Sequence, residues 1–204
     1  SGEFTIVGTD KSLTIEEVAG LANSTDNLPE GMKTGLFETG VYEASAPTFP
    51  NGCHVCELEI DQETGQIELL RYTIVDDVGR VINPLTLKGQ IHGGVVQGLG
   101  QVFLEDLIYD PNDGQMLTGS FMDYAMPRAS DFCLFDVISN EVLTTTNPVG
   151  AKGGGECGTV GSVAAAMNAI LDALSVLNIK HLDLPATPQK IWEAINDSDQ
   201  LQNF

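Results

Sequence analysis

A run of glycines that leads directly into an apolar segment is the feature that most limits how this chain can fold. The run extends from Asn147 to Gly158 and contains one carboxylate, that of Glu156. Small residues have almost no side-chain surface to bury, so they serve where a backbone bends sharply or is approached closely. The next segment carries apolar residues at intervals of three and four, which predicts an α-helix over 159–175. A glycine-rich loop would therefore deliver an acid to a helix N-terminus, where unpaired N–H groups and the helix dipole favour anions.

The charge of the chain excludes two classes of partner. Of its 204 residues, 29 are acidic and 9 are basic, which gives a formal net charge of −20. Such a charge repels nucleic acid and anionic membranes. No apolar run approaches the roughly 18 residues of a membrane-spanning helix, and the first residues do not resemble an export signal. We therefore expect no nucleic-acid partner and no membrane insertion. Because the chain does not begin with Met, we expect it to be a piece of a longer gene product.

The four cysteines are Cys53, Cys56, Cys133 and Cys157. Only Cys53 and Cys56 form a C-x-x-C pair, and no second pair stands at zinc-finger spacing. If that segment is a strand, the two thiols point to opposite faces. Buried thiols in a reducing compartment and a metal or redox pair are both open at this point, and the first favours a cytoplasmic location.

The N-terminal region contains predicted elements but no chemistry. A short strand is expected at Phe4–Val7, and Thr14 with Glu17 forms a capping box that begins a helix over 14–22. The residues from Ala22 to Met32 are typical of a loop, and Leu36 to Tyr42 are predicted to return to strand.

A long β-hairpin is predicted over 53–75. Apolar residues from Cys56 to Ile60 alternate with acidic ones, the turn at 62–65 ends in Gly65, and alternation resumes up to Ile74. The second strand runs into the adjacent pair Asp76 and Asp77. These carboxylates suit either a bound cation or a turn with a nearby arginine as partner.

The segment from Leu85 to Asp106 has helical spacing of apolar residues and yet contains five glycines. Each glycine costs a helix about 1 kcal/mol relative to alanine. A helix with this many glycines therefore implies close packing against another backbone or a bulky ligand. Gln90 and Gln97 are seven residues apart and fall on one helical face. Their amides can both donate and accept hydrogen bonds, as a flat heterocycle or a phosphate requires.

The remaining segments complete the predicted fold. Extended structure is expected at Phe121–Ala129 and at Cys133–Val142. A final helix should begin with Thr187 as N-cap and Pro188 at its first position, with Ile191, Trp192 and Ile195 sealing it onto the core. The pattern predicts an α+β fold with small mixed or antiparallel sheets, a long hairpin and two main helices. One domain is expected over 1–196, followed by a polar tail over 197–204.

Three motifs occur in order along the chain, at Gly89–Gly100, Asp123–Arg128 and Pro148–Glu156. Together they resemble the C-terminal part of the large, molybdopterin-binding subunit of the xanthine dehydrogenase/aldehyde oxidase family. The sequence of residues 118–129 is most similar to that of the carbon monoxide dehydrogenase-like branch of this family. The resemblance covers the chain from about Gly8 to Ile195 and implies that the fold is a lobe of a larger subunit.

The resemblance implies a molybdenum-dependent oxidoreductase that oxidises a small carbon substrate, such as an aldehyde, an N-heterocycle or carbon monoxide, with oxygen from water. Glu156 matches the family's active-site glutamate, which acts as proton acceptor. The residues that match contacts to the molybdenum–molybdopterin cofactor are Gln90, Gln97, Lys152, Gly153, Gly154 and Gly155. No residue is assigned as a metal ligand, and packing explains His92 at least as well as a role in the site.

The family's large subunit is several times longer than this chain. The resemblance therefore implies that this chain alone is inactive. Its implied partners are the remainder of the large subunit, iron–sulfur and flavin (FAD) subunits or domains, and a small-molecule substrate. Whether the pterin carries a cytosine nucleotide stays open. The alternative is a stand-alone acidic domain that binds a partner or a small anion without chemistry.

Overall fold

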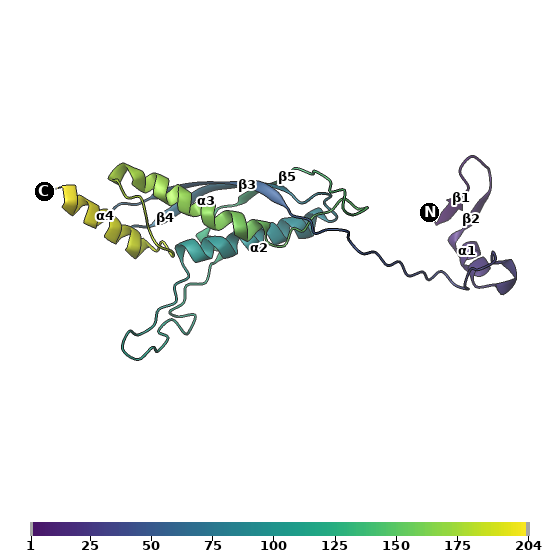
Figure 1. The fold of residues 1–204 in the computed structure, drawn as a ribbon, viewed down its shortest axis with the longest axis horizontal. Coiled ribbons are helices and arrows are strands. Elements are labelled where there is room, and N and C mark those ends of the chain that lie inside the picture. Colours follow the sequence, from purple (N-terminus) through teal and green to yellow (C-terminus); the bar gives the residue numbers. More distant parts are fainter. Residues whose placement is uncertain (1, 203–204) are drawn as a thin grey trace. The chain divides into compact units, whose positions relative to one another are not determined.

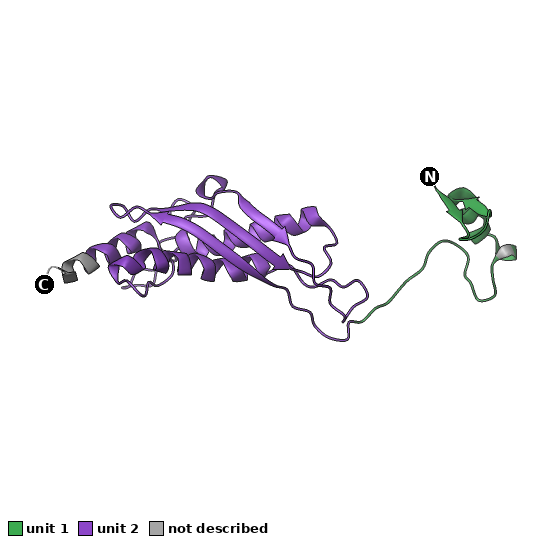
Figure 2. Cartoon of the chain, turned by 90° about the horizontal axis from the view of Figure 1, so that it is seen from above, with its two compact units in different colours: residues 1–43 green, residues 44–204 purple. Residues whose placement is uncertain are grey.

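The computed structural model describes residues 2–202, with the side chains of residue 27 and of residues 198–202 outside the description. Contacts divide the chain into two compact units, Ser1–Glu43 and Ala44–Phe204 (Figure 2). The single domain that the sequence predicts over 1–196 stays a prediction.

The first unit is a small β-hairpin followed by a helix. Strand β1 (Glu3–Thr5) pairs antiparallel with β2 (Ser12–Thr14), and α1 (Ile15–Ala22) follows at once. The Thr14 hydroxyl accepts from the Glu17 amide, and the Glu17 carboxylate accepts from the Thr14 amide, so the predicted capping box is confirmed. A 3-10 turn at Thr25–Asn27 comes next. The strand predicted at Leu36–Tyr42 is wrong, because this exposed segment joins neither sheet in the described part of the chain.

A three-stranded mixed sheet forms one layer of the second unit. Its strands β3 (Asn51–Ile60), β4 (Ile67–Asp77) and β5 (Phe135–Ser139) lie in that order, with β3 and β4 antiparallel and β4 and β5 parallel. The predicted hairpin is confirmed. Its turn needs Gly65, which has a φ of 71° and lies so close to the Pro188 carbonyl that a Cβ could not be placed there.

Two long helices cover one face of this sheet (Figure 1). They are α2 (Pro84–Phe103) and α3 (Cys157–Leu174), which pack against each other, while α3 also packs on β3 and α2 on β5. Asn83 caps α2 by accepting from the Leu85 and Thr86 amides, and Pro84 occupies the first turn, where no N–H is needed. The core between the layers is built from Tyr72, Ile74, Ile91, Val95, Leu99, Val102, Ala166, Ile170 and Ile191, each no more than 1% exposed.

Glycines explain how closely α2 and α3 approach. A Cβ at Gly158 would lie 2.5 Å from the Ile91 carbonyl oxygen, and one at Gly94 would lie 3.0 Å from the Thr159 nitrogen. A Cβ at Gly98 would collide with the buried Ser162 hydroxyl. The prediction that close packing accounts for the smoothness of α2 is confirmed for these positions. At Gly89 and Gly93 a Cβ would meet nothing within 4 Å, so packing within this chain does not require them.

Several local predictions are wrong or incomplete. Residues 121–124 form a turn instead of a strand, because the Ser120 carbonyl accepts from the Tyr124 amide and its hydroxyl donates to Asp123. A 3-10 turn at Ala129–Asp131 follows, and only Phe135–Ser139 of the second predicted stretch is strand.

The final helix, α4, spans Pro188–Gln202 and therefore continues through most of the predicted polar tail. Ile191 and Ile195 are buried as predicted, but Trp192 is 44% exposed because it lies on the outer side of the helix.

Helix α3 is also more apolar than the sequence reading allowed. The stretch Cys157–Leu177 has the length and a mean hydropathy of 1.7 that by composition alone would suit a membrane span. The expectation that no apolar run approaches the length of a membrane-spanning helix is therefore wrong. Alanine, valine, leucine and isoleucine side chains give the segment its hydropathy, and one side of it packs against α2 and β3. A helix packed in the core of a folded domain passes the same test.

Candidate functional site

The glycine-rich loop is fastened to the chain that leaves β4. The Lys152 amide donates to the Val78 carbonyl over 2.8 Å, and the Arg80 amide donates to the Gly150 carbonyl over 3.0 Å. Asn147 closes the turn by accepting from the Gly150 amide over 2.7 Å and donating to the Ala151 carbonyl. Gly79, at a φ of 63°, lets the two segments meet, since a Cβ there would overlap the Gly150 carbonyl. The start of the loop is therefore rigidly placed.

An ion pair between Lys152 and Asp77 also holds the loop. Lys152 Nζ lies 2.5 Å from Asp77 Oδ2, and both side chains are largely buried. Asp77 also accepts from the amides of Gly79 and Val142. Burial alone would raise the pKa of Asp77, but the hydrogen bond from Lys152 and those two amides outweigh it and lower the pKa to about 2.

Of the two explanations left open for Asp76 and Asp77, the turn has Arg80 as the nearby arginine, but the structure pairs Asp77 with Lys152. Arg80 uses its Nε to donate to the Val149 carbonyl. The cation reading of Asp76 and Asp77 lacks a ligand set, since the described residues contain no group of three or more His, Cys, Asp or Glu side chains that suits a metal ion.

The two glutamines of α2 both face this loop and the start of α3. Gln90 Nε2 donates to the Gly155 carbonyl over 2.8 Å, and the Thr159 hydroxyl lies 3.2 Å from Gln97 Oε1 while also bonding the Gly94 carbonyl. Gln90 thus reaches the loop and Gln97 reaches the first turn of α3, across 65 and 62 residues of sequence. Their contacts with a cofactor stay a prediction. Thr159 is a contact that sequence reasoning missed.

One cleft lies between the loop and the start of α2. It has a volume of about 430 Å³ and includes four of the residues predicted to bind cofactor, namely Gln90, Lys152, Gly154 and Gly155. We call it the Gln90 cleft. Arg80, Asn83 and Thr86 add polar groups to its wall. At Gly153 and Gly155 a Cβ would meet nothing within 4 Å, so the backbone there is open to a bulky group. The bare backbone leaves room for a planar group to approach the loop closely.

A second cleft is lined by the end of the same loop and contains Glu156. It has a volume of about 500 Å³ and is lined by Gly52, His54, Asp76, Glu156, Cys157 and residues of the first turns of α3. We call it the Glu156 cleft. Glu156 is exposed and occupies the N-cap position of α3, but its carboxylate does not cap the helix. The acid is therefore available to a molecule in the cleft.

The Glu156 cleft is lined by the buried side chains of His54 and Asp76, and sequence analysis did not mark His54 or its neighbour Tyr72. His54 Nδ1 lies 2.9 Å from the Tyr72 hydroxyl, and His54 Nε2 lies 3.5 Å from Asp76 Oδ1. Burial, followed by the charges of Cys56 and Asp76, raises the pKa of Tyr72, so its hydroxyl keeps its proton. The alternation of β3 and β4 places these side chains on the covered face, and that was the only available signal.

The four cysteines are free thiols. Cys53 is exposed and Cys56 half-buried on the other face, which confirms that they point to opposite sides of the strand. Burial, with smaller effects from Cys133 and Glu57, raises the pKa of Cys56 to about 12. Cys157 donates to the Gly154 carbonyl over 3.1 Å, and burial and then the charge of Asp76 raise its pKa. His92 packs edge-on against Phe135, and burial lowers its pKa, which suits a packing residue.

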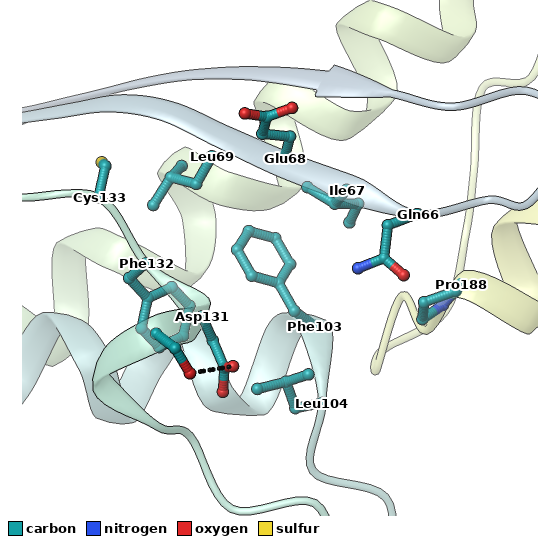
Figure 3. Close-up of a pocket in the computed structure, with 11 residues that line it drawn as sticks. Gln66, Ile67, Glu68, Leu69, Phe103, Leu104, Asp131, Phe132, Cys133 and Pro188 are labelled. Atoms are coloured by element: carbon teal, nitrogen blue, oxygen red, sulfur yellow. Dashed lines mark hydrogen bonds between the residues drawn. The ribbon is translucent and has the colours of Figure 1, made fainter.

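A third cleft lies away from the loop, where α2 ends (Figure 3). It has a volume of about 570 Å³ and is lined by Leu69, Phe103, Leu104, Phe132, Cys133 and Pro188 among others. None of the residues predicted for the site lines it. The Gln90 cleft and the Glu156 cleft, which are lined by residues predicted for the site, therefore form the candidate site.

The chain is similar to a family model and to several known proteins. The family model described as the molybdopterin cofactor-binding domain matches residues 1–133. The gamma subunit of the 6-hydroxypseudooxynicotine dehydrogenase complex of Paenarthrobacter nicotinovorans is 37% identical over 194 residues, which is 94% of this chain and 24% of that protein. The carbon monoxide dehydrogenase large chain of Afipia carboxidovorans is 32% identical over 90% of this chain and 22% of its own length. The chain spans about a quarter of the length of the curated relatives it matches.

Solved structures give the same result. Reconstituted carbon monoxide dehydrogenase from Oligotropha carboxidovorans superposes with a TM-score of 0.88 at 29% identity, covering 98% of this chain and 25% of that one. Quinoline 2-oxidoreductase from Pseudomonas putida 86 superposes with a TM-score of 0.82 at 34% identity, covering 91% and 24%. The predicted fold class, an α+β lobe similar to part of a larger subunit, is confirmed.

Proposed function

We propose, from the premise that the chain belongs to the molybdopterin cofactor-binding domain family, that it forms one wall of the active site of a molybdenum hydroxylase. The observation that carries the proposal is the placement of the loop over 152–157. Lys152, Gly154 and Gly155 line the Gln90 cleft, and the next residue, Glu156, lines the Glu156 cleft. A cofactor group and an acid would therefore meet at one short segment of backbone.

The Gln90 cleft would hold the pterin part of the cofactor. Gln90 anchors the Gly155 carbonyl, and Gly153 and Gly155 leave the backbone bare for close approach. The Lys152 ammonium is paired with Asp77, so its contribution to the cofactor would come from its backbone and from the placement of the loop. Gln97 completes this arrangement through Thr159. When bound, the molybdenum centre supplies the two-electron acceptor for oxidation of the substrate.

Glu156 would act as a proton acceptor. Its carboxylate is free of a capping role and faces an open cleft, so it can take the proton from the water-derived oxygen that is transferred to the substrate carbon. The walls of this cleft include apolar residues of α3 such as Val160 and Ala164, which exclude water from one side of a small substrate.

The relatives, and not this chain, support the proposed substrate class and partners. The relatives named for 6-hydroxypseudooxynicotine, quinoline and carbon monoxide chemistry support a small carbon substrate, and they do not favour the alternative of a stand-alone binding domain. We propose the remainder of the large subunit, iron–sulfur and flavin subunits as partners. A cytosine dinucleotide form of the pterin and a cytoplasmic location complete the proposal.

The test is the variant Glu156→Gln in the complete enzyme. Loss of a general base lowers kcat by about 10²–10⁴-fold, while molybdenum and pterin content should equal those of the parent enzyme. Glu59→Gln, an exposed acid on β3, serves as the matched control. Unchanged turnover in Glu156→Gln would contradict the role of this residue.

A further inference from the structure

A buried pair of ionisable side chains, His54 and Asp76, lies beneath the first turns of α3. Their side chains are 5% and 3% exposed, and His54 joins Asp76 Oδ1 to the Tyr72 hydroxyl. The second carboxylate oxygen, Asp76 Oδ2, is buried and makes no hydrogen bond within the described part of the chain. Burying a carboxylate with an open acceptor is costly. An apolar residue at position 76 would be buried at a lower cost in free energy. We therefore expect a role of His54 and Asp76 beyond packing.

Two glycines make room for the pair. A Cβ at Gly161 of α3 would lie 2.6 Å from Cε1 and Nδ1 of His54, and a Cβ at Gly52 of β3 would overlap Asp76 Oδ1. Helix α3 therefore rests directly on the imidazole ring, four residues after Cys157. The height of the first turns of α3 above the sheet depends on His54.

Asp76 and its neighbour Asp77 reach opposite ends of the loop that carries Glu156. Successive residues of a strand point to opposite faces, and Asp77 accordingly pairs with Lys152 at the start of the loop. Asp76 lies on the other face, beside Cys157 at the end of the loop, where its charge acts on the thiol. Cys157 in turn bonds the Gly154 carbonyl and so closes the last turn of the loop over Glu156.

We propose that Asp76 and His54 are positioning residues for Glu156. They fix the end of the loop, through Cys157 and the first turns of α3, as the Asp77–Lys152 pair fixes its start. Neither residue needs to touch the substrate. This inference rests on the proposed function of Glu156. The titratable groups around His54 are Tyr72 and Asp76 from β4, with Cys157 and Glu156 in the same cleft at the start of α3.

The variant Asp76→Asn in the complete enzyme tests the proposal, because it keeps the shape and removes the charge. A displacement of about 1 Å in a reacting group can cost about 10²-fold in rate, so kcat should fall by roughly 10-fold to 10²-fold while KM and molybdenum content stay the same. In the same protein, alkylation of Cys157 by iodoacetamide is followed against pH by mass spectrometry of its peptide. The pH at which the alkylation rate of Cys157 is half its maximum should be lower in the variant, because a negative charge beside the thiol is lost.

The outcomes separate this inference from the function on which it rests. If Glu156→Gln lowers turnover but Asp76→Asn changes neither kcat nor the pH of half-maximal Cys157 alkylation, the positioning role is overturned and the proposed function stands. If Glu156→Gln itself leaves turnover intact, the proposed function fails first. If the Asp76→Asn variant does not assemble into the complete enzyme, the variant His54→Gln tests the proposal instead. We expect it to have a lower kcat and faster amide hydrogen exchange over residues 157–161. Unchanged exchange and kcat in that variant would also overturn the proposal.

Discussion

The side-chain amide of Gln90 donates a hydrogen bond to the carbonyl oxygen of Gly155, 2.8 Å away, and so joins α2 to the loop one residue before Glu156. The two residues are 65 positions apart in the sequence. The bond orients the peptide between Gly155 and Glu156, because a carbonyl held at one end fixes the plane of the whole peptide unit. Both clefts therefore depend on one amide from α2.

Replacing Gln90 by Glu should weaken cofactor retention. The carboxylate cannot donate and would repel the Gly155 carbonyl, whereas the size of the side chain is unchanged. Loss of a residue that orients a binding group typically lowers affinity by about 10–100-fold. Molybdenum content of the purified complete enzyme, measured by mass spectrometry, should fall. Gln101→Glu on an exposed position of the same helix is the control, and equal molybdenum content in both variants would contradict the prediction.

Alanine substitutions in the glycines of the two helices should have opposite effects on stability. At Gly158 the added methyl would meet the Ile91 carbonyl at 2.5 Å, so the helices must separate, at a cost of about 1–3 kcal/mol. At Gly93 it would meet nothing within 4 Å, and the gain in helix propensity should stabilise this chain by about 1 kcal/mol. Urea unfolding of the two variants measures both effects. A destabilised Gly93→Ala variant would show that the position packs against something in this chain.

Breaking the ion pair of Lys152 should destabilise the chain near neutral pH. Lys152→Met leaves the buried Asp77 charge without its cation, and removing one partner of a buried pair costs roughly 3 kcal/mol. Arg71→Met breaks the exposed Arg71–Asp136 pair and should cost less than about 1 kcal/mol. Equal free energies of unfolding for the two variants at pH 7 would show that burial of the Lys152 pair has no effect.

The same pair predicts a dependence of stability on pH. The pKa of Asp77 is lowered to about 2 in the folded chain, against about 3.9 in an unfolded one. A lowered carboxyl pKa contributes stability that is complete above the unfolded value and is lost as pH falls through the folded value. The free energy of unfolding should therefore decrease between about pH 4 and pH 2. Asp77→Asn should show a smaller decrease over this interval in urea titrations at each pH.

The thiols of Cys53 and Cys56 should differ in reactivity. With its pKa raised to about 12, Cys56 has a thiolate fraction of only about 10⁻⁴ at pH 8. Cys53 is exposed on the opposite face of β3. Iodoacetamide at pH 8 should label Cys53 well before Cys56, as peptide mass spectrometry would show. Labelling at equal rates would mean that β3 opens readily.

Local signals made much of the fold predictable. The capping box at Thr14 and Glu17, the asparagine and proline that begin α2, and the alternation of β3 and β4 each act over a few residues. The segments around Ser120 and Leu36 were predicted wrongly because their extended patterns found no strand to pair with in the described structure. Hydrogen bonding between neighbours decided the turn after Ser120 instead.

The sequence by itself determined the glycine loop, the acid within it and the helix that follows, because backbone freedom and helical spacing are properties of short stretches. It also marked Gln90 and Gln97 as neighbours on one helical face. Only the tertiary structure decided which groups meet the loop. Lys152 pairs with Asp77, 75 residues away, and His54 and Asp76 come together only when β3 and β4 pair. Such contacts depend on how layers pack at close range, and no local pattern encodes the partner of a buried charge.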